Sequence, residues 1–170
     1  MPGSHKRFEM MDPAREAELL ASSQSGDRGA FLELVAYYKG PVYRVLFALT
    51  RSADDSAELA QETFVRAWHS IAEFPTGRRF FPWTLKIARN LPATLAARGP
   101  DRDAEDPVLG AFADLRSDDR VAMALCLVER LPYEEIAALL DVPVAVAILR
   151  LSQARGLLLS RAVEGGGEAA

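Results

Sequence analysis

Cysteine and histidine are scarce in this sequence, and their scarcity argues against several kinds of site. Cys126 is the single cysteine, so no disulfide can form within the chain, and its apolar surroundings predict a buried structural thiol. The two histidines, His5 and His69, are far apart, and no Cys/His cluster has metal-ligand spacing. No Ser/His/Asp, Cys/His or phosphate-loop pattern occurs either. We therefore expect no metal, no cofactor and no catalytic residue, and an enzyme has little support.

Long apolar runs and strand signals are also lacking. No run approaches the roughly 18 apolar residues of a membrane span, and the N-terminus lacks the apolar stretch of a secretion signal. Few β-branched runs alternate, and no Asn-Gly or Asp-Gly hairpin occurs. Because helical periodicity dominates instead, we predict an all-α fold, in a cytoplasmic protein without membrane insertion.

The apolar periodicity divides the chain into helices and two modules. Asp12 is expected to cap the first helix with Pro13 in its first position, and Gly40-Pro41 to separate two later helices. The expected helices are 12–23, 28–39, 41–50, 54–71, 81–95, 114–129, 132–140 and 144–162. A polar, proline-flanked stretch near residue 100 is typical of a linker. We predict two small helical modules, at 12–99 and 112–163, a linker at 100–111 and a disordered tail at 164–170.

Charge is unevenly distributed between these modules. The net charge of −4 argues mildly against a simple nucleic-acid binder. Residues 1–99 hold 13 Lys/Arg and 11 Asp/Glu, a balance of +2, whereas residues 100–170 hold 7 and 13, a balance of −6. A dipolar chain of this kind can bind phosphates at one place and remain acidic overall.

A basic stretch in the first module is interleaved with aromatic residues. Single-stranded nucleic-acid sites need this mixture, because cations hold phosphates while rings stack on unpaired bases. The alternative is that the rings pack in the core and the arginines are solvated, and core packing is favoured for any one of these residues. The mixture comprises Arg78, Arg79, Phe80, Phe81, Trp83, Lys86, Arg89 and Asn90.

The second module has the pattern of a helix-turn-helix. A short helix at 132–140, with Ile136, Ala137 and Leu140 facing inward, precedes a tight turn at 141–143. The helix that follows is long enough to lie in a major groove. Many helical hairpins share this spacing, so the pattern alone indicates DNA binding only moderately.

Taken together, these segments resemble the extracytoplasmic-function sigma factors of the sigma-70 family. Gln61-Glu62-Thr63-Phe64, with the helix around it, resembles the part that binds core RNA polymerase. Ile87-Ala88-Arg89-Asn90 resembles the promoter-melting helix, and 131–155 resembles the C-terminal module. The likeness covers roughly residues 18 to 160 in the family's order and spacing. It implies core RNA polymerase, promoter DNA as duplex and melted strand, and an anti-sigma factor or another protein as partners.

The resemblance also implies roles for matching positions. An acidic and amide helix face would meet the coiled coil of the polymerase's largest subunit, and the plain alternative is a solvated helix face. This face comprises Asp55, Glu58, Gln61, Glu62 and Phe64. The eight residues of the mixture between Arg78 and Asn90 would meet the opened minus-ten strand. Arg150, Gln153 and Arg155 in the last helix would approach the minus-thirty-five duplex.

Positions that face DNA in the family depart from its pattern here. Pro92 is expected to kink or end the melting helix, and Thr94 replaces an Asp. Val146, Ile148 and Leu149 stand where Thr, Lys and Ser are usual, and they form an apolar patch typical of a protein interface, unless they turn inward onto the linker. Two hypotheses follow: an alternative sigma factor that directs promoter-specific transcription, or a sigma-like regulator acting through protein contacts. The regulator would sequester an anti-sigma factor, occupy polymerase, or bind promoters beside a second subunit.

Overall fold

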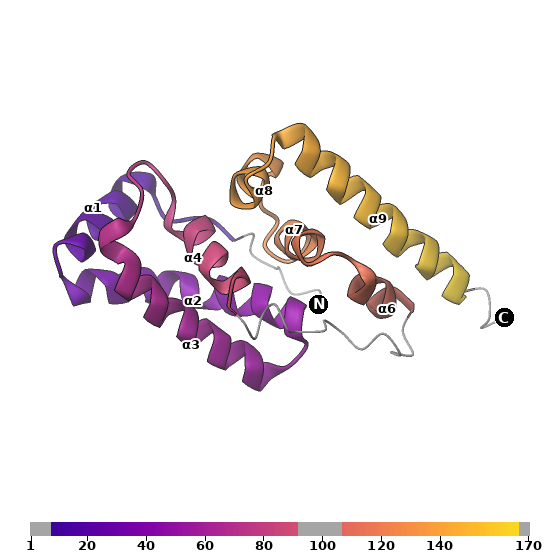
Figure 1. The fold of residues 1–170 in the computed structure, drawn as a ribbon, viewed down its shortest axis with the longest axis horizontal. Helices are drawn as coiled ribbons and strands as arrows, with labels where there is room; N and C mark the ends of the chain where they lie inside the picture. Colours follow the sequence, from indigo (N-terminus) through magenta and orange to yellow (C-terminus); the bar gives the residue numbers. More distant parts are fainter. Residues whose placement is uncertain (1–7, 92–106, 167–170) are drawn as a thin grey trace, which may run out of the picture.

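The computed structural model describes residues 8–91 and 107–166, which fold into packed helices with no strand among them (Figure 1). The predicted all-α fold is therefore confirmed. The elements are α1 (Pro13–Gln24), α2 (Arg28–Thr50), α3 (Ala53–Ser70), the 3₁₀ turn η1 (Ile71–Glu73), α4 (Phe80–Arg89), α6 (Pro107–Asp114), α7 (Ser117–Leu127), α8 (Tyr133–Leu140) and α9 (Val144–Gly166).

The first module is organised around α2, which packs against α1, α3 and α4. Side-chain caps set where its helices begin. The Asp12 carboxylate accepts hydrogen bonds from the backbone N–H groups of Ala14 and Arg15 at 3.1 and 3.0 Å, as the sequence predicted. At α3 the cap is Ser52, whose hydroxyl accepts from the Asp55 N–H at 3.2 Å.

The predicted break at Gly40-Pro41 is wrong, because α2 runs through it without interruption. A proline inside a helix lacks a donor and costs about 3 kcal/mol relative to alanine. The neighbouring Tyr38, Val42 and Val45 are all at most 1% exposed. Full burial of one such side chain stabilises by roughly 1.5–3 kcal/mol. Burial of this shared face therefore exceeds the penalty at Pro41 and holds both halves of α2 in line.

Four other boundaries in the chain differ from the expectations. The helix expected over 114–129 is interrupted, so that α6 ends at Asp114 and α7 begins at Ser117. Most of the expected linker at 100–111 lies outside the described residues, and its last part, from Pro107, belongs to α6. The helix expected over 81–95 ends at Arg89, with 92–95 outside the described residues. Residues 164–166, the start of the expected tail, are the last residues of α9.

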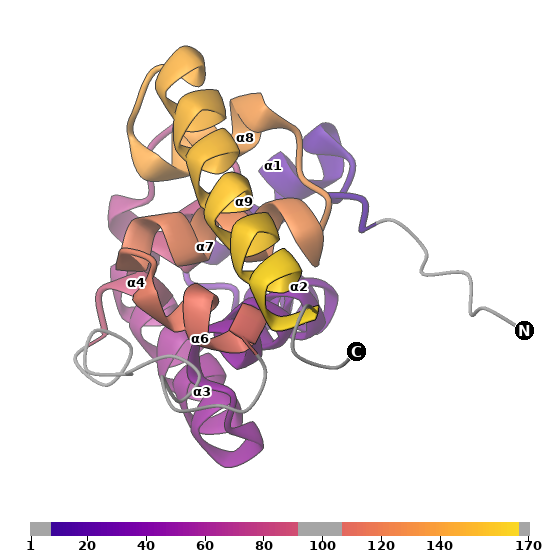
Figure 2. The same ribbon diagram turned by 90° about the vertical axis from the view of Figure 1, so that its right-hand side faces the viewer.

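The two modules share one hydrophobic core. Figures 1 and 2 show α7 and α8 between the first module and α9, and α2 packs on α7 while α4 packs on α8. An ion pair that crosses this boundary joins a buried carboxylate to a partly exposed arginine. Both nitrogens of the Arg44 side chain that face Glu129 donate to its carboxylate, at 2.7 and 2.9 Å. The Glu129 side chain is fully buried, so it depends on Arg44 for compensation of its charge.

None of the described helices combines the length and apolar character needed to cross a bilayer. Within the same residues, no three His, Cys, Asp or Glu side chains are grouped as a metal site would need.

Replacing Arg44 with Gln is expected to lower the free energy of unfolding by about 2 kcal/mol, because it leaves the Glu129 carboxylate buried without a counter-charge. Urea denaturation followed by circular dichroism measures this loss. Lys39→Gln removes the same charge from an exposed position of α2 and serves as the control, with a change within about 0.5 kcal/mol. Equal losses for both variants would contradict the assignment of Arg44 as the partner that compensates Glu129.

Candidate nucleic-acid interface

The basic and aromatic segment forms a loop and the helix α4. The loop turns at Pro75–Arg78, where the Arg78 N–H donates to the Pro75 carbonyl at 3.3 Å. Gly77 lies in this turn with φ of +76°, a backbone conformation that side chains disfavour. The turn brings Arg78 and Arg79 to the start of α4, whose N-terminal cap position is Arg79.

A buried carboxylate from α1 fixes that start. Glu16 is 1% exposed, and its carboxylate accepts a hydrogen bond from the Phe80 N–H at 2.6 Å. Arg79 donates to both oxygens of Glu16 at 3.1 Å, and the Tyr38 hydroxyl donates to the same group. Arg79 also donates to the Met11 carbonyl at 2.5 Å. Glu16 thus caps α4 from another helix and neutralises its charge on Arg79.

The Glu16 cluster explains why some predicted DNA contacts lie in the core. Phe80 and Phe81 have no exposed surface, and Tyr38 stacks on Phe81 with ring centres 5.6 Å apart. Burial and then the hydrogen bond to Glu16 raise the pKa of Tyr38, so its hydroxyl stays protonated and donates. Both phenylalanines therefore pack in the core and do not lie free to stack on bases, which is one of the two possibilities left open by the sequence. Arg79 is held by Glu16 and is not presented as a free phosphate ligand.

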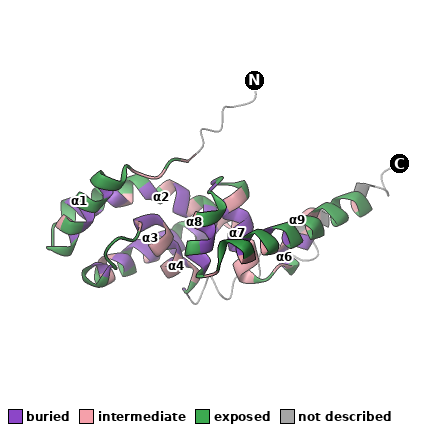
Figure 3. Cartoon of the chain, turned by 90° about the horizontal axis from the view of Figure 1, so that it is seen from above, coloured by how far each residue is buried: buried purple, intermediate pink, exposed green. Residues whose placement is uncertain are grey.

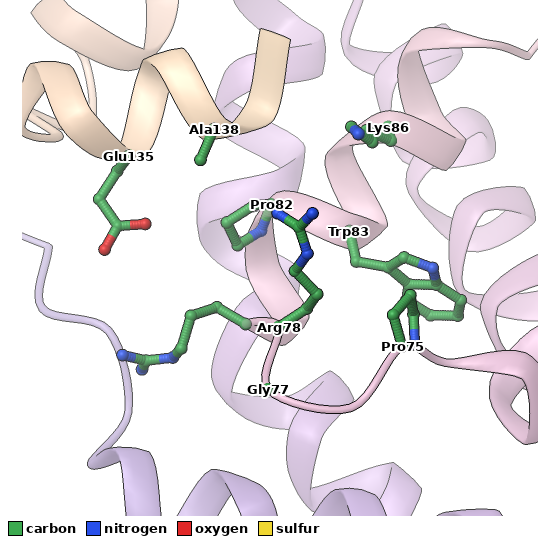
Figure 4. Close-up of a pocket in the computed structure, with 9 residues that line it drawn as sticks. Pro75, Gly77, Arg78, Pro82, Trp83, Lys86, Glu135 and Ala138 are labelled. Atoms are coloured by element: carbon green, nitrogen blue, oxygen red, sulfur yellow. The ribbon is translucent and has the colours of Figure 1, made fainter. Parts of the chain in front are cut away.

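A cleft of about 280 Å³ lies beside the remaining candidates, between α4, its preceding loop and α8. Figure 4 shows Arg78, Pro82, Trp83 and Lys86 on one side of the cleft and Glu135 and Ala138 on the other. Trp83 is half-buried, with its ring 5.0 Å from that of Phe74 in an edge-to-face arrangement. The cleft combines cations with a partly accessible ring, the mixture that unpaired nucleotides need.

Two cations of α4 are already paired with carboxylates of the second module. Lys86 donates to Asp141, and Arg89 donates to Asp118 at 3.2 Å. The hydrogen bond from Lys86 lowers the pKa of Asp141, so this contact is favourable above the ordinary Asp pKa and is lost as pH falls through the lowered value. Asn90, at the end of α4, is exposed.

The helix-turn-helix forms as predicted. Ile136, Ala137 and Leu140 are buried where α8 packs on α9, and Asp141 ends α8 in a left-handed conformation, with φ of +54°. On α9, Gln153 and Arg155 are exposed, whereas Arg150 is half-buried and lies 3.9 Å from the Asp118 carboxylate.

The apolar patch of α9 faces outward. Ile148 and Leu149 are 42% and 57% exposed, while Val146 is half-buried. Figure 3 shows exposed residues along the length of α9. Cys126 is not fully buried as predicted: it is half-buried near the Arg155 guanidinium, which lies 3.8 Å from its sulfur.

The candidate polymerase-binding residues cluster on α3. Asp55, Glu58 and Gln61 are exposed, and Glu62 forms an ion pair of 2.6 Å with Arg66 one turn away. Phe64 is buried at the base of an apolar groove of about 360 Å³ between α2 and α3. Leu32, Val35, Gln61, Val65 and Trp68 also line this groove.

Sequence reasoning missed four carboxylates that organise this site: Glu16, Asp118, Glu129 and Asp141. Their partners lie 63, 29, 85 and 55 residues away in sequence. No local spacing in the sequence indicates which of these pairs form.

Part of the chain matches a known protein family. The family described as Sigma-70 region 2 matches residues 34–93, which include most of α2 and all of α3 and α4. The RNA polymerase sigma-H factor of Pseudomonas aeruginosa is 27% identical, over 86% of this chain and 93% of that protein.

Two solved structures share the fold. CnrH, in complex with the cytosolic domain of CnrY, aligns with a TM-score of 0.70 at 24% identity, over 86% of this chain and 96% of that one. The sigma factor RpoE from Bartonella quintana, in complex with the anti-sigma factor NepR, aligns with a TM-score of 0.61 at 22% identity, over 77% and 95%.

Replacing Glu16 with Gln is expected to lower the free energy of unfolding by about 3 kcal/mol, because Arg79 loses its counter-charge and the cap of α4 weakens. Urea denaturation checks the loss. Glu18→Gln, an exposed position of the same helix in a surface ion pair with Arg15, is the control and should change stability by less than about 1 kcal/mol. A loss at Glu16 as small as that at Glu18 would show that the cluster does not hold α4.

Proposed function

This chain belongs to the extracytoplasmic-function sigma factors of the sigma-70 family, and we propose that it binds core RNA polymerase and directs promoter-specific initiation of transcription. The observation that carries the proposal is the match to Sigma-70 region 2, because it falls on the helices that hold both the α2–α3 groove and the basic cleft. We place this activity in the cytoplasm, where polymerase and chromosome are found. The family is not one of enzymes.

The α2–α3 groove is the proposed polymerase-docking surface. Leu32 and Val65 are exposed apolar residues at the groove, which is a favourable centre for an interface. Asp55 and Glu58 lie exposed on the same helix as Val65 and would orient a basic partner and speed its association. Because Phe64 is buried below them, its contribution would be to support the groove.

The basic cleft is the proposed site for the opened minus-ten strand. Arg78, Lys86 and Arg89 would bind phosphates, and the accessible part of Trp83 would stack on a base. Asn90, exposed at the end of α4, has the paired donor and acceptor that can read a base edge. On α9, Arg150, Gln153 and Arg155 would approach the minus-thirty-five duplex.

A second candidate function is favoured by the patch on α9. Ile148 and Leu149 place large apolar side chains on the outward face of the helix that would otherwise enter the groove of DNA. Contacts to phosphates supply much of the affinity for DNA, and apolar side chains make no such contacts. A regulator that binds an anti-sigma factor or another protein through α9 would explain this exposure.

The docking surface is tested by Val65→Glu, which places a charge at the groove without altering the buried core. Binding to core RNA polymerase, measured by fluorescence anisotropy, is expected to weaken at least about tenfold, because an interface centre disfavours an unpaired charge. Val163→Glu, 77% exposed near the end of α9, is the matched control and should bind like the parent chain. Run-off transcription from a pooled genomic template should then give specific products for the parent and the control only. Equal polymerase binding by both variants would show that the groove is not the docking surface. Absence of run-off products with the parent chain would contradict the sigma-factor activity.

The second candidate is tested by Ile148→Lys combined with Leu149→Ser. If α9 binds a protein, this variant loses a partner that the parent chain retains in pull-downs from native cells read by mass spectrometry. Leu159→Ser, 61% exposed on the same helix, is the control. Retention of every partner together with tighter promoter binding would eliminate the regulator hypothesis.

A further inference from the structure

The outer face of α9 carries a stripe of uncharged residues along most of its length. Its members recur alternately every four and every three residues, the spacing by which two helices pack side by side. They lie on the side of α9 opposite Ala147, Leu151 and Ala154, which are buried against the second module. In Figure 2, α9 runs across the front of that module, and no described helix covers its outer face. The stripe comprises Ala145, Leu149, Ser152, Gly156, Leu159 and Val163, all of them exposed.

Three members of the stripe are large and apolar. Leu149, Leu159 and Val163 are 57%, 61% and 77% exposed. Single exposed apolar residues are ordinary on a protein surface, but a row of them along one helix face marks a protein interface. The outer face of α9 therefore has the composition of a second packing face rather than that of a solvated one.

The order of residue sizes along the stripe suits contact with an identical stripe. An antiparallel pair of α9 helices centred on residue 154 brings together Leu149 with Leu159, Ser152 with Gly156, and Ala145 with Val163. The small residues Ser152 and Gly156 then lie at the centre, where crossing helices approach most closely. The two leucines lie on either side of that point. Each contact is made twice, as a two-fold symmetric dimer requires.

The charges of α9 favour a second copy over a charged partner. Each charged side chain of the helix contacts a group of its own chain, and none lies in the stripe. These contacts are Arg150 with Asp118 at 3.9 Å, Arg155 with the Cys126 sulfur at 3.8 Å, and Arg161 with Glu164 at 3.8 Å. A strongly acidic or basic partner would find no opposite charge in the stripe, whereas an identical uncharged stripe needs none.

We propose that two copies of this chain associate through antiparallel α9 helices, with the stripe as a two-fold interface. From Ala145 to Val163 the stripe is about 28 Å long, on a helix about 10 Å wide. Such a contact buries on the order of 1,000 Å² from the two copies together, close to the minimum for a specific interface. The dimer is therefore weak, with an expected dissociation constant on the order of 10 μM.

The first test measures association of the full chain by sedimentation velocity, from about 1 to about 300 μM. The parent chain is expected to move from the 18.6 kDa of one copy towards twice that mass as concentration rises. Gly156→Gln is the interface variant. A Cβ at Gly156 meets nothing within 4 Å in the single chain, and glutamine favours the helix, so the variant folds. In the dimer its side chain lies at the point of closest approach, and association should weaken at least about tenfold.

Ala162→Gln is the matched control for this test. It introduces the same side chain at an exposed position of α9 that lies outside the stripe, so it should associate like the parent chain. A parent chain that remains monomeric over the whole range would overturn the proposal. Equal association by the two glutamine variants would overturn it as well.

The second test determines the orientation of the two helices, in chains that also carry Cys126→Ala. A chain with Ala145→Cys is mixed with a chain with Val163→Cys, and diamide oxidises neighbouring thiols to disulfides by taking up their two hydrogen atoms. The antiparallel dimer places these two cysteines together, so the mixture should form disulfide-linked dimers. Either chain alone should not, because its two cysteines lie about 27 Å apart across the pair. Efficient linkage of each chain alone, or no linkage in the mixture, would contradict the antiparallel interface.

These outcomes are distinct from failure of the proposed function. Polymerase binding is measured at nanomolar concentrations, where the chain is monomeric, so it does not depend on the stripe. If the chain dimerises but supports no transcription, the interface is correct and the sigma-factor activity fails. If it supports transcription but sediments as a monomer at every concentration, the dimer alone is overturned.

Discussion

The buried carboxylate of Glu16 is the constraint on which the first module depends. A charge removed from water costs several kcal/mol unless it is paired and hydrogen-bonded. Glu16 meets this requirement by accepting from Tyr38, Arg79 and the Phe80 backbone, so it ties α1 to α2 and to the first residue of α4. The position of α4 then determines where the basic cleft lies and which of its residues face the second module.

Local patterns predicted the elements of the fold well and their joins less well. Asp12 capped α1 as expected, and Ile136, Ala137 and Leu140 faced inward, because caps and apolar periodicity depend on neighbouring residues alone. The break expected at Pro41 does not occur. The cost of a proline in a helix can be read from the sequence, whereas the burial that outweighs it depends on packing against other helices. Pairs such as Arg44–Glu129, 85 residues apart, follow from packing that no local pattern encodes.

The candidate site was predictable as a segment and only partly as a set of residues. In the structure, the members of the mixture between Arg78 and Asn90 divide between core and surface. Phe80, Phe81, Thr84, Leu85 and Ala88 form the buried face of α4, with the spacing of an amphipathic helix. That spacing was present in the sequence and places the two phenylalanines inside. Arg79, in contrast, is the cap residue before the helix. It pairs with Glu16 of α1, which lies 63 residues away in sequence, so the spacing within α4 does not predict this contact.

The acidity of the second module has a physical meaning once the contacts are known. A chain of net charge −4 is poorly suited to search DNA nonspecifically, since affinity there comes from cations that replace counterions. Asp118 and Asp141 pair with Arg89 and Lys86, so two of the cations of α4 have counter-charges within the chain.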